Sequence, residues 1–179
     1  PLQPLHMRNR DYKIFVPNGY YHAFNRGNNK QPIFLDREDY IFFLFRLKES
    51  VFPGTIKSTG RYTRKALPSQ AFTLLAYCLM PNHFHLLIRQ NGTVPISKLL
   101  SKVCTSYSMY FNKKHERSGT LFGSEFKSTH LDSDEYLKYM YSYIHLNPIK
   151  LIDPAWKENG ISNTKEEENF LNKYIFSSY

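Results

Sequence analysis

The sequence predicts an α+β fold of the ferredoxin-like, or split βαβ, type, in which an antiparallel sheet carries helices on one face and leaves the other available. Three observations predict it. The expected elements follow the order strand, helix, strand, strand, helix, strand, helix. Two apolar segments are separated only by Pro81-Asn82, a connection typical of adjacent antiparallel strands. The 179 residues suffice for one domain with a hydrophobic core.

The first strand and helix lie within residues 19–49. Residues 19–25 are rich in aromatic side chains, as strands often are, and are followed by the turn-forming sequence Gly27-Asn28-Asn29. Asp36 can cap a helix that extends to about Glu49. Its apolar positions recur at helical spacing, at Tyr40, Phe43, Leu44 and Leu47. This apolar face should pack on a sheet.

Residues 72–80 and 83–89 are the two apolar strands around Pro81-Asn82. Pro95 is tolerated in the first turn of a second helix, which ends before Ser118-Gly119. That helix is predicted from the spacing of Ile96, Leu99, Leu100, Val103, Tyr107, Tyr110 and Phe111.

The last predicted core elements are a strand at residues 126–131 and a third helix. Asp132 or Ser133 can cap this helix, and Asn147-Pro148 ends it, since proline disfavours a helical residue before it. The tail from Gly160 is first acidic and then apolar, a pattern expected for a short docked helix.

We expect three segments. Residues 1–6 precede Met7 and look like a cloning remnant, residues 7–160 form a single domain, and residues 161–179 form the tail. The longest apolar runs, such as residues 40–44, are too short to span a bilayer, so no membrane association is expected. Cys78 and Cys104 lack a C-x-x-C spacing, which argues against a disulfide framework and fits a reducing cytoplasm.

The charge balance favours a polyanionic partner. The chain has 24 Lys and Arg against 15 Asp and Glu, a net charge of +9. Its 14 Tyr and 14 Phe favour nucleic acid, because aromatic rings stack on unpaired bases, although most of them should be core. A loop at residues 50–69 could touch phosphates through Lys57, Arg61, Arg64 and Lys65.

His83 and His85 are the first candidates for a functional site. They are two residues apart in a predicted strand, so both side chains leave one face while Phe84 enters the other. Neutral imidazole is a good ligand for divalent transition metals, and two ligands leave positions open for a phosphate oxygen. An isolated pair of this kind is more often simply a solvated part of a sheet face.

The third predicted helix carries a second candidate pair. Tyr143 and Asn147 are four residues apart and share a helix face, with Tyr139 one turn earlier. If this face lies over the histidine strand, Asn147 can complete a metal site and Tyr143 can lie beside the bound phosphate. A tyrosine at helical spacing is otherwise usually part of the core.

Residues 80–87 (MPNHFHLL) and 143–148 (YIHLNP) together resemble the HUH single-tyrosine transposases, most closely the REP-associated tyrosine transposases. The resemblance extends from about Tyr20 to Leu151. It departs after Leu121-Phe122, where relatives often carry Gln-Gly-Arg and this chain has Gly-Ser-Glu, which puts one DNA contact in doubt. The resemblance implies the HUH fold and a transposase that cuts and rejoins single-stranded DNA.

The same resemblance implies roles for individual residues. Tyr143 would be the nucleophile that forms a 5′-phosphotyrosine, and His83, His85 and Asn147 would hold Mg²⁺ or Mn²⁺. His145 lies on a different helix face and is interpreted as a residue that packs or that supports the site indirectly, rather than as a base. The DNA would be a hairpin or palindromic repeat, bound by a monomer or a homodimer. Candidate DNA contacts are Arg26, Asn28, Lys102, Lys113, Lys114, Arg117, Lys127 and Lys150.

Two other functions remain open at this stage. A non-catalytic nucleic-acid-binding module on the same fold could use sheet aromatics as stacking platforms, but leaves the histidine pair and the tyrosine–asparagine pair unexplained. A metal-dependent nuclease that activates water would use the histidines without Tyr143. The covalent attachment of DNA to the protein distinguishes the transposase from both.

Overall fold

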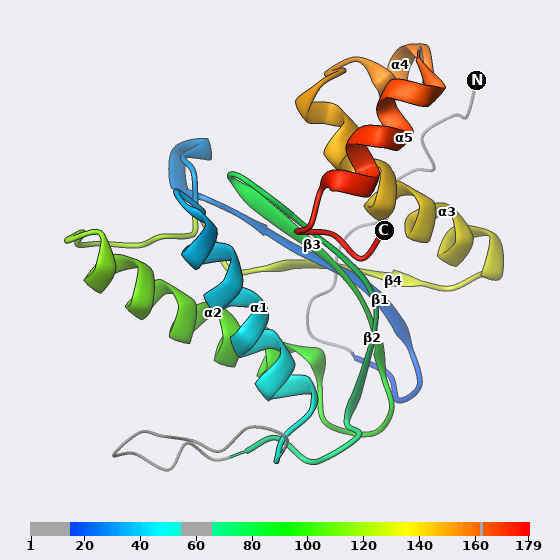
Figure 1. The fold of residues 1–179 in the computed structure, drawn as a ribbon. Coiled ribbons are helices and arrows are strands. Elements are labelled where there is room, and N and C mark those ends of the chain that lie inside the picture. The colour runs from blue at the N-terminus through cyan, green and yellow to red at the C-terminus, as the bar shows by residue number, and fades with distance from the viewer. Residues whose placement is uncertain (1–14, 55–65, 162) are drawn as a thin grey trace.

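A computed structural model describes residues 15–54, 66–161 and 163–179 (Figure 1). The segment interpreted as a cloning remnant, residues 1–6, lies outside the described residues. So do the four loop cations at positions 57, 61, 64 and 65.

The sheet has four strands, β1 (Tyr20–Arg26), β2 (Phe72–Met80), β3 (His83–Gln90) and β4 (Lys127–Leu131). Their order is β2-β3-β1-β4, and each neighbouring pair is antiparallel. Placing β1 and β3 in the middle is the ferredoxin-like arrangement. The predicted fold class is therefore confirmed.

Two helices, α1 (Arg37–Val51) and α2 (Ile96–Lys114), cover one face of this sheet (Figure 1). α1 begins with a capping box, in which the Asp36 side chain accepts from the backbone of Asp39 and the Asp39 side chain accepts from the backbone of Asp36. The main core lies between these helices and the sheet, and its largest side chains include Tyr21, Phe43, Phe84, Tyr107 and Phe111.

The third helix, α3 (Asp134–Leu146), lies on the opposite face (Figure 1). Its apolar stripe, Met140 and Ile144, is buried in a second cluster against strand residues such as Leu87. The expectation of an available face is therefore wrong where α3 packs, because burying this stripe covers β2, β3 and part of β4.

Shorter elements complete the chain. A single turn, η1 (Asn28–Lys30), follows β1. After α3 come η2 (Asn147–Leu151), α4 (Trp156–Asn159) and α5 (Thr164–Lys173). The residues after α5 run along the edge of β2, where the Leu79 amide donates to the Phe176 carbonyl at 2.9 Å and the Ser178 amide to the Tyr77 carbonyl at 3.0 Å. This segment covers a strand edge that would otherwise be unpaired.

Replacing Asp39 with alanine is expected to lower the free energy of unfolding by about 2–4 kcal/mol. The Asp39 carboxylate is fully buried and accepts the Leu35 amide at 2.8 Å, Lys114 at 3.2 Å and His115 at 3.0 Å. These contacts join the start of α1 to the end of α2. Urea unfolding of Asp39→Ala measures the loss, with Glu38→Ala as a control, because Glu38 meets Lys114 while remaining 76% exposed. Equal losses in both variants would contradict the prediction.

Candidate functional site

The alternation of β3 places the two histidines on the α3 side of the sheet. Phe84, Leu86 and Ile88 enter the core under α1 and α2, whereas Leu87 joins the cluster under α3. His83 and His85 share the face of Leu87. Their ring centroids lie 5.0 Å apart with the planes nearly perpendicular. Both histidine side chains therefore lie on one face of the sheet, as their spacing predicts.

Each histidine uses its Nδ1 atom in a contact within the protein. His83 Nδ1 lies 2.6 Å from Asn82 Oδ1, to which it donates, and His85 Nδ1 lies 2.8 Å from His22 Nε2. When His85 Nδ1 is the donor of that bond, Nε2 of both rings carries a lone pair for a metal ion. Hydrogen bonds of this kind fix the tautomer and orientation of metal-binding histidines.

Sequence reasoning missed His22. It lies on β1 opposite Leu87, is only 6% exposed, and its ring stacks on His85 with centroids 5.0 Å apart. A histidine in the middle of an apolar strand was the available signal. Its partner could not be identified without the pairing of β1 with β3.

Tyr143 and Asn147 meet the histidines from α3. The Tyr143 ring lies edge-on to His85, with centroids 5.6 Å apart, and to His22 at 6.2 Å. Asn147, the C-cap of α3, is 1% exposed and lies against His83, but its Oδ1 atom meets no donor in good hydrogen-bond geometry among the described residues. A buried oxygen without a partner is costly unless something binds it. The structure thus brings together four of the predicted site residues.

This donor set fits a divalent metal ion. Two imidazole Nε2 atoms and one amide oxygen are ordinary ligands for such ions, and within the described residues the buried Asn147 Oδ1 has no well-aligned donor. Burial, together with the charges of Arg26, Lys150 and Lys157, lowers the pKa of His83 to about 4, although the polar contact with the Asn147 side chain raises it in part. Burial, followed by the neighbouring His22 and His83, holds the pKa of His85 well below its usual value. Both rings are therefore neutral at pH 7, as metal binding requires.

The metal-free protein is expected to lose stability as the pH falls from 7 to 5. A histidine in the unfolded chain takes up a proton near pH 6.5, whereas folded His83 does so near pH 4. Between these values the unfolded state binds more protons, so the free energy of unfolding decreases as the pH falls. One pKa unit corresponds to about 1.4 kcal/mol. Urea titrations from pH 7 to 5 measure the slope, and a double variant, His83→Gln with His85→Gln, should show a shallower one. An equal slope in the wild-type protein and the double variant would show that these two histidines do not cause the loss of stability.

Three cations lie near the histidines. Arg26 is directly opposite His83 in the β1–β3 register, and Lys150 in η2 and Lys157 in α4 also act on its pKa. Gly27 follows Arg26 in a turn where an added Cβ would collide with the Gln31 carbonyl, so only glycine fits this close approach. Lys157 was not among the residues predicted from the sequence.

The remaining predicted DNA contacts lie at varying distances from this site. Lys127 is opposite Phe24 in the β1–β4 register, on the histidine face of the sheet. Asn28 lies in η1, and its backbone amide donates a hydrogen bond to the Leu121 carbonyl. The other four are on or just after α2, which covers the opposite face: Lys102, Lys113, Lys114 and Arg117. Lys114 is held there by the carboxylates of Asp36, Glu38 and Asp39.

A second group of metal-ligand residues, Asp36, Asp39 and His115, lies at the ends of α1 and α2. Its carboxylates already cap α1 and pair with Lys114 and His115. The lysine supplies the positive charge that an ion would otherwise provide. We interpret this group as a structural tie between the two helices.

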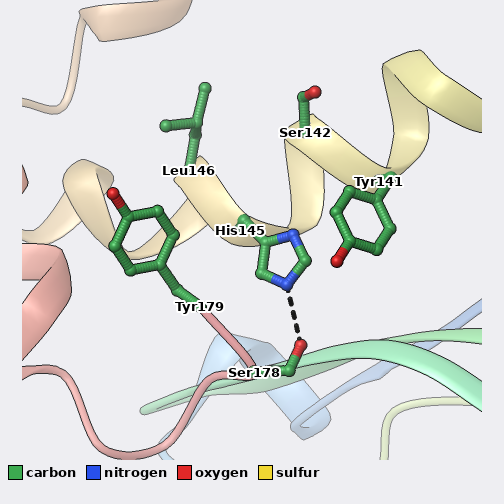
Figure 2. A pocket seen from close by; sticks show the side chains of 6 residues that line it. All are labelled: Tyr141, Ser142, His145, Leu146, Ser178 and Tyr179. Carbon is green, nitrogen blue, oxygen red and sulfur yellow. Dashed lines mark hydrogen bonds between the residues drawn. The ribbon is translucent and has the colours of Figure 1, made fainter.

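His145 faces away from the histidine pair and anchors α3 to the chain end. Its Nε2 atom lies 2.9 Å from Ser178 Oγ, beside a hollow between α3 and the C-terminal residues (Figure 2). Tyr141 and Tyr179 flank the buried ring of His145 in this hollow (Figure 2). Of the two interpretations of His145, packing agrees with this position.

Comparisons with known proteins identify relatives. Residues 16–147 match the family model described as IS200-like transposase. The structure resembles that of a REP-associated tyrosine transposase bound to a REP hairpin, with a TM-score of 0.60, 11% identity and coverage of 96% of this chain and 82% of that one. A crystal structure from Deinococcus radiodurans R1, described as a candidate transposase, gives a TM-score of 0.45 and 14% identity, covering 76% of this chain and 94% of that one. No curated protein matches significantly in sequence.

Within the described residues, no helix is both long and apolar enough to cross a bilayer.

Proposed function

Because the chain belongs to the IS200-like transposase family, we propose that it cuts and rejoins single-stranded DNA through a covalent bond to Tyr143. The observation that carries the proposal is the position of the Tyr143 ring, edge-on to His85, on the same helix whose C-cap Asn147 lies against His83. A nucleophile beside a set of metal ligands is the arrangement that phosphoryl transfer requires.

In the proposed reaction, Tyr143 Oη attacks the scissile phosphorus. The Oη–P bond forms, the P–O3′ bond breaks, and the proton of Oη ends on the released 3′ oxygen. The protein then holds the 5′ phosphate as a phosphotyrosine, which keeps the energy of the phosphodiester linkage. A 3′ hydroxyl can attack this phosphotyrosine, so strands are rejoined by the same step in reverse.

We propose that His83, His85 and Asn147 hold a divalent ion, Mg²⁺ or Mn²⁺. When bound, the ion would polarise a phosphate oxygen of the scissile group. The protein supplies the orientation: Asn82 and His22 hold the two histidine rings, and α3 presents Asn147 and Tyr143 on one helix face.

The proposed DNA is a single strand that folds into a hairpin. A structurally similar REP-associated transposase is described as bound to a REP hairpin, which supports this choice. Arg26 and Lys150 lie beside His83, and Lys127 lies on the same sheet face, so these three cations are proposed to contact phosphates nearest the cut.

The test uses single-stranded DNA containing the repeats that flank the gene, labelled at one end or the other. With Mn²⁺, a 3′ label should become covalently attached to the protein on a denaturing gel, whereas a 5′ label should leave on a shorter fragment. EDTA should abolish both products. Cleavage without a covalent band would favour the water-activating nuclease. Binding without cleavage of any flanking sequence would favour the binding module.

A further inference from the structure

We propose that Lys157 is a further catalytic residue of this site, whose ammonium group holds the Tyr143 oxygen and balances its charge during strand cleavage. The inference rests on the proposed function of Tyr143. It concerns what assists the tyrosine, a question that neither the metal ligands nor the sequence motifs answer.

The contact between these two side chains is direct. Lys157 Nζ donates a hydrogen bond to Tyr143 Oη at 2.9 Å and lies 4.1 Å from the centroid of the same ring. The ammonium therefore touches the atom that would attack phosphorus. It also interacts with the face of the ring, which restricts where the phenol can turn.

Lys157 lies in the short helix α4, which follows α3 and η2 in the chain. η2 follows α3 directly, and Asp153 Oδ1 then accepts the Ala155 amide at 3.0 Å. The backbone amides of Glu158 and Asn159 donate to the Ala155 carbonyl, which closes the α4 turn around Lys157. The turn that carries the lysine is thus held by local hydrogen bonds.

The charge of Lys157 also reaches the metal ligands. It is one of the charges that lower the pKa of both His83 and His85, in addition to burial. One cation therefore lies near the nucleophile and near the proposed metal ligands, where the scissile phosphate must bind. A phosphate carrying negative charge would be attracted to the same point.

The chemistry of an ammonium group defines its role. It has three donors and no acceptor, so it cannot remove the tyrosine proton. It can stabilise negative charge as the Oη–H bond breaks and the Oη–P bond forms, and it can afterwards hold a phosphotyrosine oxygen. Groups that donate to a developing oxyanion commonly contribute about 10²-fold or more to rate. Lys157 is exposed, so we expect a loss of about 10- to 100-fold in its absence.

The experiment measures single-turnover formation of the covalent product at saturating DNA and Mn²⁺, from pH 6 to 9. Lys157→Ala should be about 10- to 100-fold slower at pH 7. The deficit should shrink at higher pH, where solution hydroxide removes the tyrosine proton more readily. Lys157→Arg should retain most of the rate, and added ethylammonium should partly restore Lys157→Ala. Lys165→Ala, an exposed lysine on α5, is the matched control.

The outcomes separate the two proposals. If the wild-type protein forms no covalent product, the proposed function fails and the role of Lys157 fails with it. If the wild-type protein reacts and Lys157→Ala reacts within twofold of it at every pH, only the role of Lys157 is overturned. A slower Lys157→Ala with an unchanged pH profile and no response to ethylammonium would also overturn it, because a purely structural loss has those properties.

Discussion

Replacing Tyr143 with phenylalanine is expected to abolish the covalent protein–DNA product while the fold and DNA binding persist. The change removes a single oxygen atom, and the ring that lies edge-on to His85 and His22 remains. Without Oη, no bond to phosphorus can form at this position. We expect the rate of covalent attachment to fall on the order of 10³-fold or more, to the limit of detection.

Tyr139→Phe is the matched control for this prediction. Tyr139 lies one turn earlier on α3, is 46% exposed, and its ring is parallel to that of Tyr143 with centroids 6.3 Å apart. Both substitutions delete the same hydroxyl from the same helix face. If the covalent product persists in Tyr143→Phe and disappears in Tyr139→Phe, the nucleophile is Tyr139 and our proposal is wrong. Retention of metal-dependent cleavage without the adduct in Tyr143→Phe would favour attack by water.

The fold could be predicted because each element carries its own local pattern. The capping residue Asp36, the helical spacing through Leu47, and the short Pro81-Asn82 connection are readable without knowing any tertiary contact. The same spacing rules placed His83 with His85 and Tyr143 with Asn147 on common faces. These pairs depend only on the geometry of one strand and one helix.

His22 and Lys157 could not be found in that way. The contact of His22 with His85 depends on the pairing of β1 with β3, which are 63 residues apart at this point. Lys157 reaches Tyr143 through the turn after η2, whose path has no periodic pattern. Lys114 is a residue for which the sequence was misleading. Its positive charge suggested a DNA contact, but in the structure it pairs with the carboxylates at the start of α1. Charge in a sequence does not reveal which charges compensate one another after folding.

Replacing either His83 or His85 with alanine is expected to remove the metal and, with it, DNA cleavage, while DNA binding changes little. Losing one of three proposed ligands should weaken Mn²⁺ binding at least about 10- to 100-fold and cleavage on the order of 10³-fold. His22→Ala should weaken Mn²⁺ binding without abolishing it, because it removes the Nδ1 partner of His85 and leaves the ligand in place. Calorimetric titration with Mn²⁺ and the covalent gel assay measure the two effects separately.

His130→Ala supplies the control for these variants, since His130 is exposed on β4 and its ring contacts Tyr21. A further variant, Asp39→Asn, tests the other group of candidate ligands at the ends of α1 and α2. If Mn²⁺ binding survives in His83→Ala and His85→Ala but is lost in Asp39→Asn, the metal is bound on the wrong side of the sheet for Tyr143, and the proposed active site cannot be correct. If Mn²⁺ binding is lost in the two histidine variants alone, the ion lies beside Tyr143. An ion must lie there to act on a phosphate that this tyrosine attacks.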